Sequence, residues 1–319
     1  MASKYSVAVL MGGPSSEREI SLRSGRAVAK ALDSVGHSVA EVDVRGDDPA
    51  EFDGLKADVA FVALHGRFGE DGQVQRLLEQ RRIPYTGSGP VASRLAMDKL
   101  ASKRQFLRSG IDTPAYQVLS REDGIPVLEQ CGRSLGFPVV IKPRAEGSSV
   151  GVTIHRDRSR LADGAELATR TGRTALMERF IEGREMTVGI LENRPLPVIE
   201  LVHGREFFDY AAKYEDPDTA CIVDPVLPKR DCAALQMTAL KAHRALGCEG
   251  ATRVDLIMTP LHQIHVLEVN TIPGMTERSL LPKAARAAGL GYADLCDKLL
   301  RLAFERERET GSWVAAALL

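Results

Sequence analysis

The length, composition and charge of the chain limit the kinds of protein it can be. Its 319 residues are enough for two or three domains, and a hydrophobic fraction of 44% excludes an intrinsically disordered chain. Positive and negative side chains nearly cancel to a net charge of -1, so the overall charge gives no reason to expect nucleic acid or a membrane as a partner.

The cysteines and the N-terminal residues are typical of a protein from a reducing compartment. The five cysteines are odd in number and lack the paired spacing of metal sites, so we expect reduced, buried thiols. They are Cys131, Cys221, Cys232, Cys248 and Cys296. The first apolar run ends at a glycine without the small-residue cleavage pattern of a signal peptide. No apolar stretch approaches the ~20 residues needed to span a bilayer, and we expect a cytoplasmic protein.

Residues 1–97 alternate strand and helix patterns. The apolar, β-branched run over 5–11 predicts a buried parallel strand, and 17–35 has helical periodicity ended by Gly36. Residues 59–64 predict another buried strand. This rhythm predicts a Rossmann-like, doubly wound α/β domain, whose ligand loops lie at the carboxyl ends of the strands.

The remaining chain divides into two mixed segments, 98–183 and 184–319. The first opens with a basic helix and holds a predicted hairpin with a glycine–serine tip, its strands over 139–142 and 151–155. In the second we expect closing helices and a polar, functional cover over 207–228. Its predicted strands are 185–191, 196–201, 252–258 and 264–269, and its predicted long helix is 230–246.

Acidic and amide side chains alternate on the last predicted pair of strands. Arg253 and Asp255 are two residues apart, as are Glu268 and Asn270, so each pair shares one face of its strand. If the two strands pair, all four side chains converge, and their oxygens suit magnesium bound together with phosphate. The alternative is an ordinary salt bridge from Arg253 to Asp255 or Glu268.

Two lysines and a glycine-rich loop suit an anion. Lys142 ends a buried strand and Lys99 opens a helix, so both ammonium groups could hold phosphates, although surface lysines are a plain alternative. The loop 146–151 offers backbone N–H groups and serine hydroxyls, but it is not a Walker motif.

Other acids and a histidine stand at the ends of predicted strands. Glu178 and Glu185 could accept from a ribose hydroxyl, with adenine on the adjacent backbone; two exposed glutamates are the alternative. Glu17 could clamp an ammonium group or serve as a first-turn acid of its helix. His65 begins a polar loop and could be a binding or a structural histidine.

Taken in order, these motifs resemble those of D-alanine–D-alanine ligases. They are Gly-Gly-x-Ser-x-Glu, His-Gly-x-x-Gly-Glu-Asp-Gly, Lys-Pro-x-x-x-Gly-Ser-Ser-Val-Gly, Arg-Val-Asp and Glu-Val-Asn-Thr-x-Pro-Gly-Met-Thr, and the resemblance also includes the segment 209–214. It implies an ATP-grasp fold, with two α+β lobes over 98–183 and 184–319 that hold ATP and an α/β domain over 1–97 that completes the amino-acid site.

The resemblance also implies a role for individual residues. The expected ATP contacts are Lys99, Lys142, Ser148, Glu178, Arg179, Ile181, Glu185 and Lys213. The expected metal ligands are Asp255, Glu268 and Asn270. The expected contacts to the two amino acids are Glu17 and His65 for the first and Ser279 and Leu280 for the second. Arg253 and the N–H of Gly274 are the expected oxyanion donors, and Tyr214 or Ser148 with Glu17 is the expected proton route.

The activity implied is ATP-dependent formation of D-alanyl-D-alanine through an acyl phosphate, for peptidoglycan precursors. It carries with it D-alanine and ATP as substrates, two Mg²⁺ or Mn²⁺, a possible monovalent cation and a homodimer through the first domain. Two alternatives stay open. A D-alanine–D-lactate ligase is one, although Tyr214 favours an amine nucleophile; a nucleotide-binding regulator without catalysis is the other, although the metal and oxyanion residues are all present.

Overall fold

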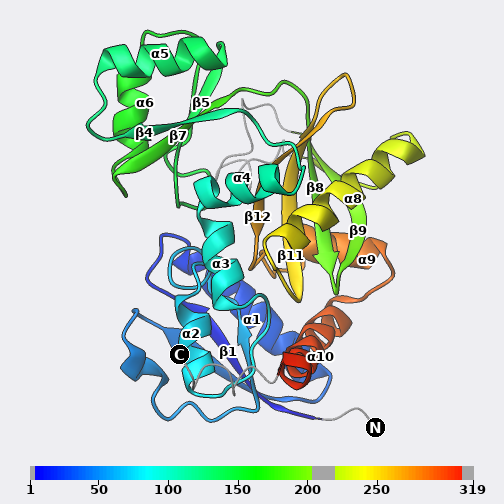
Figure 1. Cartoon of the computed structure of the whole chain (residues 1–319). Coiled ribbons are helices and arrows are strands. Elements are labelled where there is room, and N and C mark those ends of the chain that lie inside the picture. The colour runs from blue at the N-terminus through cyan, green and yellow to red at the C-terminus, as the bar shows by residue number, and fades with distance from the viewer. Residues whose placement is uncertain (1–3, 203–219, 311–319) are drawn as a thin grey trace.

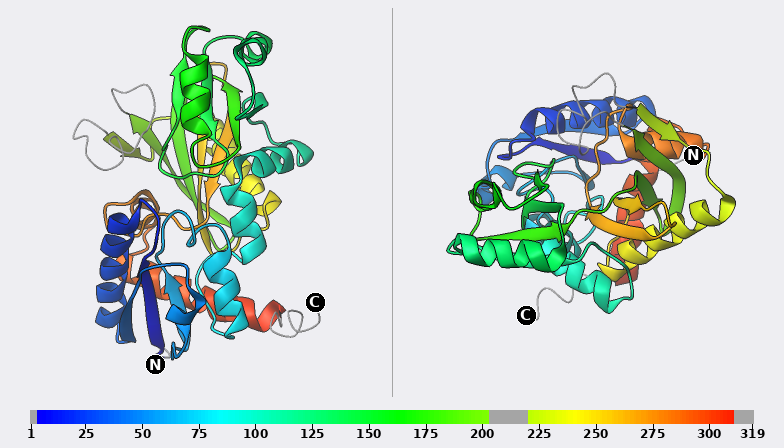
Figure 2. Two further views of the ribbon diagram at one scale, coloured as in Figure 1. Left: turned by 90° about the vertical axis from the view of Figure 1, so that its left-hand side faces the viewer. Right: turned by 90° about the horizontal axis from the view of Figure 1, so that it is seen from above.

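The structure is a computed structural model that describes residues 4–202 and 220–310. It contains a three-stranded, a four-stranded and a five-stranded sheet, each formed by one part of the chain (Figure 1). The three-stranded sheet lies at one end of the molecule, and the four-stranded sheet with its two helices lies at the other (Figure 2). Within the described ranges, no helix has both the length and the apolar character required to cross a membrane.

The first domain is a parallel sheet with helices on both faces, as predicted. Strand β1 (Ser6–Gly12) lies between β2 (Ser38–Val44) and β3 (Val59–Val62) and pairs in parallel with both. Alternate residues of β1 enter two different hydrophobic cores. The short helix η1 (Pro49–Phe52) and the helices α1 (Arg18–Ser34), α2 (Gln73–Gln80) and α3 (Pro90–Met97) complete the segment.

The central segment forms an antiparallel sheet in the order β4-β7-β5-β6. Helices α5 and α6 pack against it over one apolar core. The predicted hairpin is confirmed, since β5 and β6 pair in antiparallel fashion across the glycine–serine loop. The elements of this segment are α4 (Lys99–Arg108), β4 (Tyr116–Ser120), α5 (Ile125–Leu135), β5 (Val139–Pro143), β6 (Thr153–His155), α6 (Leu161–Ala168) and β7 (Thr174–Arg179).

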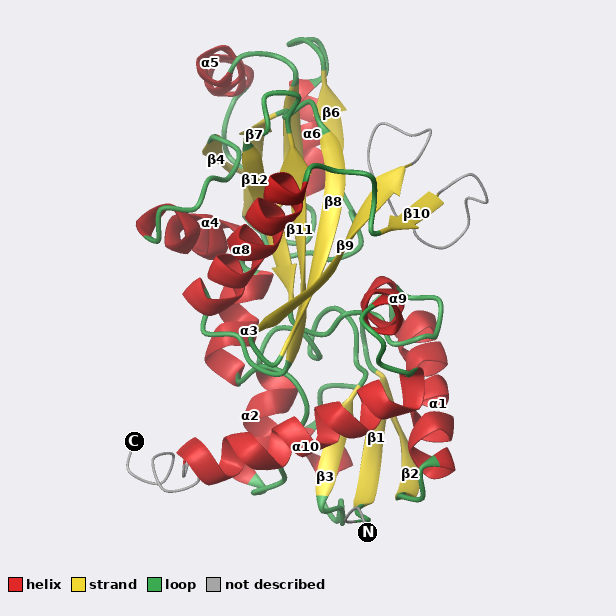
Figure 3. Ribbon diagram, turned by 90° about the vertical axis from the view of Figure 1, so that its right-hand side faces the viewer, coloured by secondary structure: helices red, strands yellow, loops and turns green. Residues whose placement is uncertain are grey.

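The last segment forms a five-stranded antiparallel sheet in the order β10-β9-β8-β11-β12. Helix α8 covers one face, and α9 lies between the β9 side of the sheet and the first domain (Figure 3). The predicted pairing of the last two strands is confirmed. The elements are β8 (Arg184–Leu191), β9 (Arg194–Val202), β10 (Ala220–Val223), α8 (Lys229–Ala245), β11 (Ala251–Met258), β12 (Ile264–Asn270), α9 (Leu280–Ala287) and α10 (Tyr292–Thr310).

Two helices pack across the proposed division into 1–97, 98–183 and 184–319. Phe106 of α4 lies in the core of the five-stranded sheet, and Leu299 of α10 lies in the core beneath the first sheet. Each sheet therefore lies within one of the three segments, while helices α4 and α10 pack against a different segment.

Some expectations of local structure were wrong. Residues 207–228 are not all irregular, because Ala220–Val223 pair with β9 as an edge strand; residues 203–219 lie outside the described ranges. Strand β2 was not predicted at all. All five cysteines are free thiols, as expected, but the expectation that all five are buried is wrong. Cys248 and Cys296 are buried, and Cys131, Cys221 and Cys232 are partly exposed.

Candidate active site

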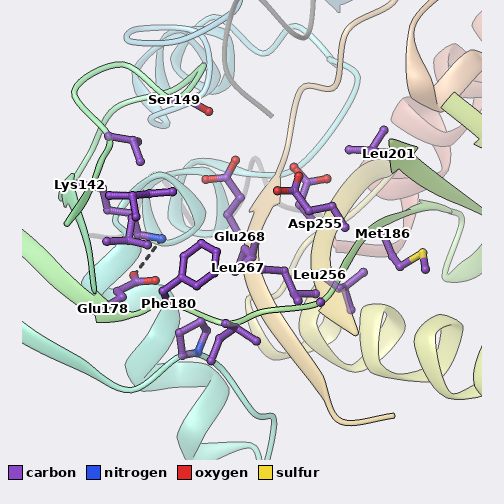
Figure 4. A pocket seen from close by; sticks show the side chains of 18 of the residues that line it. Lys142, Ser149, Glu178, Phe180, Met186, Leu201, Asp255, Leu256, Leu267 and Glu268 are labelled. Atoms are coloured by element: carbon purple, nitrogen blue, oxygen red, sulfur yellow. Dashed lines mark ion pairs between the residues drawn. The ribbon is translucent and has the colours of Figure 1, made fainter. Parts of the chain in front are cut away.

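A cavity of about 440 Å³ lies between the four-stranded and five-stranded sheets. Its walls are largely apolar and come from strands of both sheets. Figure 4 shows Lys142 beside Glu178 and, apart from this pair, Asp255 and Glu268. The part lined by Lys99, Glu146 and Glu268 is called the charged end, although other charged side chains, including Arg184 and Glu200, also line the cavity. An apolar slot with charged groups beside it suits a planar base attached to a chain of phosphates. Representative wall residues are Val140, Ile154, Met186, Leu201, Leu256 and Leu267.

The chain crosses from β7 to β8 along the floor of this cavity. Phe180, Ile181 and Glu185 all line it, so the connection places backbone groups beside any bound base. Arg179 lines it too, while its Nε donates to the carbonyl oxygen of Leu135 at 2.7 Å. The residues expected beside adenine from the family resemblance therefore line this cavity.

The carboxylate of Glu178 is buried between two lysines. Its Oε1 lies 2.9 Å from Nζ of Lys142 and 3.2 Å from Nζ of Lys103 (Figure 4 marks the first pair). Burial alone raises the pKa of the Glu178 carboxyl, but the two ammonium groups outweigh it and hold that pKa below its ordinary value. The reading of Glu178 as an exposed glutamate is wrong, and Lys142, at 8% exposure, is not a surface lysine.

Lys99 connects the glycine–serine loop with the last strand. Its Nζ donates to the carbonyl oxygen of Glu146 at 2.7 Å and lies 3.1 Å from Oε2 of Glu268. Burial lowers the pKa of the Lys99 ammonium, but the Glu268 carboxylate raises that pKa by more than burial lowers it, so the net shift is upward. Lys99 is therefore a fixed positive charge at the charged end of the cavity.

The four residues of the last two strands converge as predicted. Arg253 stands directly opposite Asn270, and Asp255 directly opposite Glu268, in the antiparallel register. Nε and Nη2 of Arg253 donate to the two carboxylate oxygens of Asp255 at 2.9 and 2.7 Å. The salt bridge weighed as an alternative thus forms, and it lies within the site rather than on a solvated face, since the Arg253 side chain is only 11% exposed.

The donor set of Asp255, Glu268 and Asn270 fits a hard divalent cation. Two carboxylates and one amide oxygen are the ligand types that magnesium takes. The amide oxygen of Asn270 accepts from the N–H of Ile272 at 2.8 Å, which leaves it one lone pair. Within residues 4–202 and 220–310, no group of three His, Cys, Asp or Glu side chains lies so that it could hold a metal.

A second cavity, of about 50 Å³, lies where the three segments meet. Lys99, Glu146 and Glu268 line both this cavity and the larger one, so the two adjoin at the charged end. The lining of the second cavity also includes Glu17, His65, Glu70, Ser148, Arg253, Asn270 and Gly274. This small, polar space suits a small amino acid with its charged ammonium and carboxylate groups.

The first domain and the glycine–serine loop meet at this junction. The hydroxyl of Ser148 donates to Oε1 of Glu17, and Oε2 of Glu17 lies so close to Gly147 that an added Cβ would stand 2.9 Å from it. Glycine at 147 therefore permits the approach of the loop. Glu17 stands at the N-cap position of α1 but makes no side-chain capping hydrogen bond, so its carboxylate is directed to the junction.

His65 holds the loop that carries Gly274. One ring nitrogen lies 3.1 Å from the hydroxyl of Ser24 and the other 3.1 Å from the carbonyl oxygen of Ile272. The Ser24 hydroxyl in turn accepts from the N–H of Met275 at 3.4 Å. The histidine thus supports the wall of the small cavity, which it also lines.

Ser279 lies beside Gly274 at the start of α9. Its hydroxyl accepts from the N–H of Thr276 at 3.2 Å and makes no capping bond to its own helix. An added Cβ at Gly274 would lie 3.0 Å from that hydroxyl, so the two residues are in close contact. Leu280 packs against the core under the first domain.

Sequence reasoning missed Lys103 and Glu70. Lys103 lies four residues after Lys99 in one helix, and that spacing places both on one face, which is the signal that could have found it. Glu70 stands within a recognised motif and lines the small cavity, with Oε1 3.6 Å from Nδ1 of His65. Lys213 and Tyr214 lie outside the described residues.

Comparison with known proteins gives one answer along nearly the whole chain. The family models described as D-ala D-ala ligase N-terminus and D-ala D-ala ligase C-terminus match residues 46–88 and 106–301. A D-alanine--D-alanine ligase of Syntrophotalea carbinolica is 47% identical over 294 residues, which are 92% of this chain and 94% of the relative.

Solved structures agree. The D-alanine--D-alanine ligase of Bacillus anthracis complexed with ATP matches with a TM-score of 0.83 at 33% identity, covering 95% of this chain and 98% of that one. The VanG D-Ala:D-Ser ligase of Enterococcus faecalis matches with a TM-score of 0.83 at 27% identity, covering 94% of this chain and 100% of that one. The fold is the ATP-grasp fold, and the chain belongs to the D-alanine–D-alanine ligase family.

Proposed function

We propose that this protein joins two molecules of D-alanine into D-alanyl-D-alanine, with ATP converted to ADP and phosphate, and so supplies a peptidoglycan precursor. Membership of the family supports the reaction. The observation that carries the proposal for the site is that a nucleotide-sized cavity adjoins a small polar cavity at Lys99, Glu146 and Glu268. The phosphate end of ATP would then face the carboxylate of the first amino acid.

In the first step, a carboxylate oxygen of the first D-alanine attacks the γ-phosphorus, and the bond to the bridging oxygen of ADP breaks. Lys99 and Lys142 hold the phosphates as positive charges, which offsets the negative charge on the transferring group. Glu17 holds the ammonium group of the first D-alanine. Closure of the glycine–serine loop, through Ser148, keeps water from the acyl phosphate.

In the second step, the amine of the second D-alanine attacks the acyl carbon and phosphate leaves. The guanidinium of Arg253 and the N–H of Gly274 stabilise the negative oxygen, a contribution commonly worth about 3 kcal/mol per donor. Ser279 and Leu280 hold the carboxylate of the second amino acid. Its ammonium loses a proton through Tyr214 or through Ser148 and Glu17, and this route favours an amine over D-lactate.

Asp255, Glu268 and Asn270 would hold two Mg²⁺ or Mn²⁺ together with phosphate oxygens. Bound there, the metal would neutralise charge on the phosphates and orient them for in-line transfer. We carry over from the family resemblance a possible monovalent cation, a homodimer through the first domain and a cytoplasmic location. Sedimentation of the purified protein tests the homodimer.

The deciding experiment measures ADP and dipeptide formation by the purified, magnesium-loaded protein. We expect ADP release that requires D-alanine, with one dipeptide formed per ADP at neutral pH. L-Alanine serves as the control, and D-lactate and D-serine as competing second substrates. The absence of ADP release in the presence of D-alanine would support the regulator without catalysis, and preferential ester formation with D-lactate would support the ester-forming ligase.

A further inference from the structure

Lys103 is a fully buried lysine just behind the nucleotide cavity. Its side chain has no exposed surface, and it is not among the residues that line the cavity. Nζ donates to Oγ1 of Thr113 at 2.7 Å and to the carbonyl oxygen of Pro114 at 3.3 Å, and it lies 3.2 Å from Oε1 of Glu178. Because these partners fix the ammonium in place, Lys103 is held away from any bound nucleotide.

Lys142 lies on the other side of the same carboxylate. Its Nζ is 2.9 Å from Oε1 of Glu178, and Lys142 lines the cavity while Lys103 does not. A single carboxylate oxygen thus forms ion pairs with two ammonium groups, of which only Lys142 lines the cavity and can reach a ligand. Since one negative charge compensates two positive ones, the group as a whole carries a net positive charge beside the phosphate site.

The free energy needed to move the Lys142 ammonium from Glu178 to a phosphate depends on the other partner of Glu178. If Glu178 had Lys142 as its sole partner, that turn would leave a buried carboxylate without a counter-charge, which is strongly unfavourable. With Lys103 in place, Glu178 keeps a partner throughout. Repulsion between the two ammonium groups also weakens the hold of Glu178 on Lys142.

We infer that Lys103 is a positioning residue for ATP binding: it holds the Glu178 carboxylate and thereby frees Lys142 to bind a phosphate. The inference rests on the phosphate role proposed above for Lys142. It differs from two simpler roles, a structural tie between α4 and β7 and a support for the shape of the base site. Each of these gives a different experimental result.

The test is a double-mutant cycle on the dissociation constant for ATP, measured by calorimetry with the full chain. Lys103→Met keeps an unbranched side chain that is one atom shorter but removes its charge, and it should weaken ATP binding roughly 10- to 100-fold. In the Glu178→Gln background the same substitution should weaken ATP binding by no more than about threefold, because residue 178 then carries no negative charge that Lys142 would have to neutralise. Turnover at saturating ATP should fall much less than ATP binding.

Competition by adenosine distinguishes an effect on phosphate binding from an effect on base binding. It has no phosphate for Lys142, so Lys103→Met should change its inhibition constant by no more than about threefold. An equal loss for adenosine and ATP would overturn the inference in favour of a support for the base site. A loss of ATP binding that persists undiminished with Glu178→Gln would overturn it in favour of a structural tie.

Two further measurements keep the outcome interpretable. Lys142→Ala tests the proposed function itself: if it leaves ATP binding unchanged, the phosphate role of Lys142 fails, and the inference about Lys103 fails with it. If Lys142→Ala weakens ATP binding while Lys103→Met does not, only the inference about Lys103 fails. Should Lys103→Met not fold, Thr113→Val removes one acceptor of the Lys103 ammonium, and it should give a smaller loss that Glu178→Gln again suppresses.

Discussion

The nucleotide-sized cavity and the small junction cavity are built from the chain in different ways. Strands of two antiparallel sheets and the connection between them form the walls of the first. Loops from all three segments, together with residues of strands β11 and β12, form the second, where Glu17, Ser148 and Gly274 come together. A wall of paired strands is fixed by many backbone hydrogen bonds, whereas a junction of loops is fixed by a few side-chain contacts.

This difference separates the expected effects of substitutions. Changes at the sheet-built cavity should alter ATP binding, because the strands hold their positions without the amino-acid substrate. Changes at the junction should alter turnover and the use of D-alanine, because that cavity is complete only when the segments meet. The predictions below test this division, starting with the largest effect.

Arg253→Lys should lower turnover about a hundredfold or more. Arginine holds Asp255 through two nitrogens and faces the junction, and lysine keeps the charge but not the planar fork. Because the guanidinium acts on charge that develops in the transition state, the loss should appear in kcat and leave the KM for ATP within about threefold.

The matched control is Arg301→Lys on α10, where an arginine also holds an aspartate, Asp297, far from both cavities. Steady-state kinetics of ADP release should show no change for it. Near-normal turnover of Arg253→Lys would show that the oxyanion site lies elsewhere.

Glu268→Gln should raise the magnesium concentration needed for half-maximal turnover roughly 10- to 100-fold. The substitution keeps the shape of the side chain but removes a ligand charge, and changes around a metal site typically cost that much affinity. A titration of activity with magnesium measures it, and Glu192→Gln, at a surface ion pair with Lys298, is the control. Ordinary magnesium dependence would reject Glu268 as a ligand.

Ser148→Ala should raise the KM for D-alanine about 3- to 10-fold and change the KM for ATP less. Its hydroxyl donates to Glu17 across two segments, and losing this bond would weaken the positioning of the Glu17 carboxylate without removing the charge that binds the ammonium group. Ser134→Ala, at an exposed position of α5, is the control. If the ATP constant changed more than the D-alanine constant, the junction would not be the amino-acid site.

Asp98→Asn should lower the melting temperature by only about 2 °C at neutral pH. Asp98 caps α4 and accepts from Nε of Arg144 at 2.9 Å. Burial raises the pKa of its carboxyl, but Arg144 and the capping N–H groups outweigh this, so the pKa in the folded protein is lowered. Asparagine keeps the cap and loses the ion pair.

The pH dependence of this difference has a definite sign. A carboxyl whose pKa is lowered by folding stabilises the protein above its unfolded pKa, and this contribution is lost as the pH falls through the folded pKa. The gap in melting temperature between the wild type and Asp98→Asn should therefore shrink below about pH 4. Thermal unfolding at pH 7 and at lower pH measures it; a gap independent of pH would contradict the assigned cause.

The amino-acid sequence by itself determined part of the elements and the chemistry of paired neighbours. The alternation of Arg253 with Asp255 and of Glu268 with Asn270 predicted a convergence that the strand register reproduces. This worked because a strand has a period of two and adjacent strands of a hairpin pair directly. Short or edge strands such as β2 and β10 were missed, because their residues are partly exposed and carry a weaker apolar pattern.

Only the tertiary structure decided which distant side chains meet. The link of Ser148 to Glu17 was expected only from the family resemblance, and nothing in the order of residues gives Lys103 and Lys142 one shared carboxylate at Glu178. Those contacts depend on how three sheets pack, and packing is set by many weak apolar contacts between segments far apart in the chain rather than by local periodicity. The sequence therefore supplied the chemical groups of the site, and the fold supplied their partners.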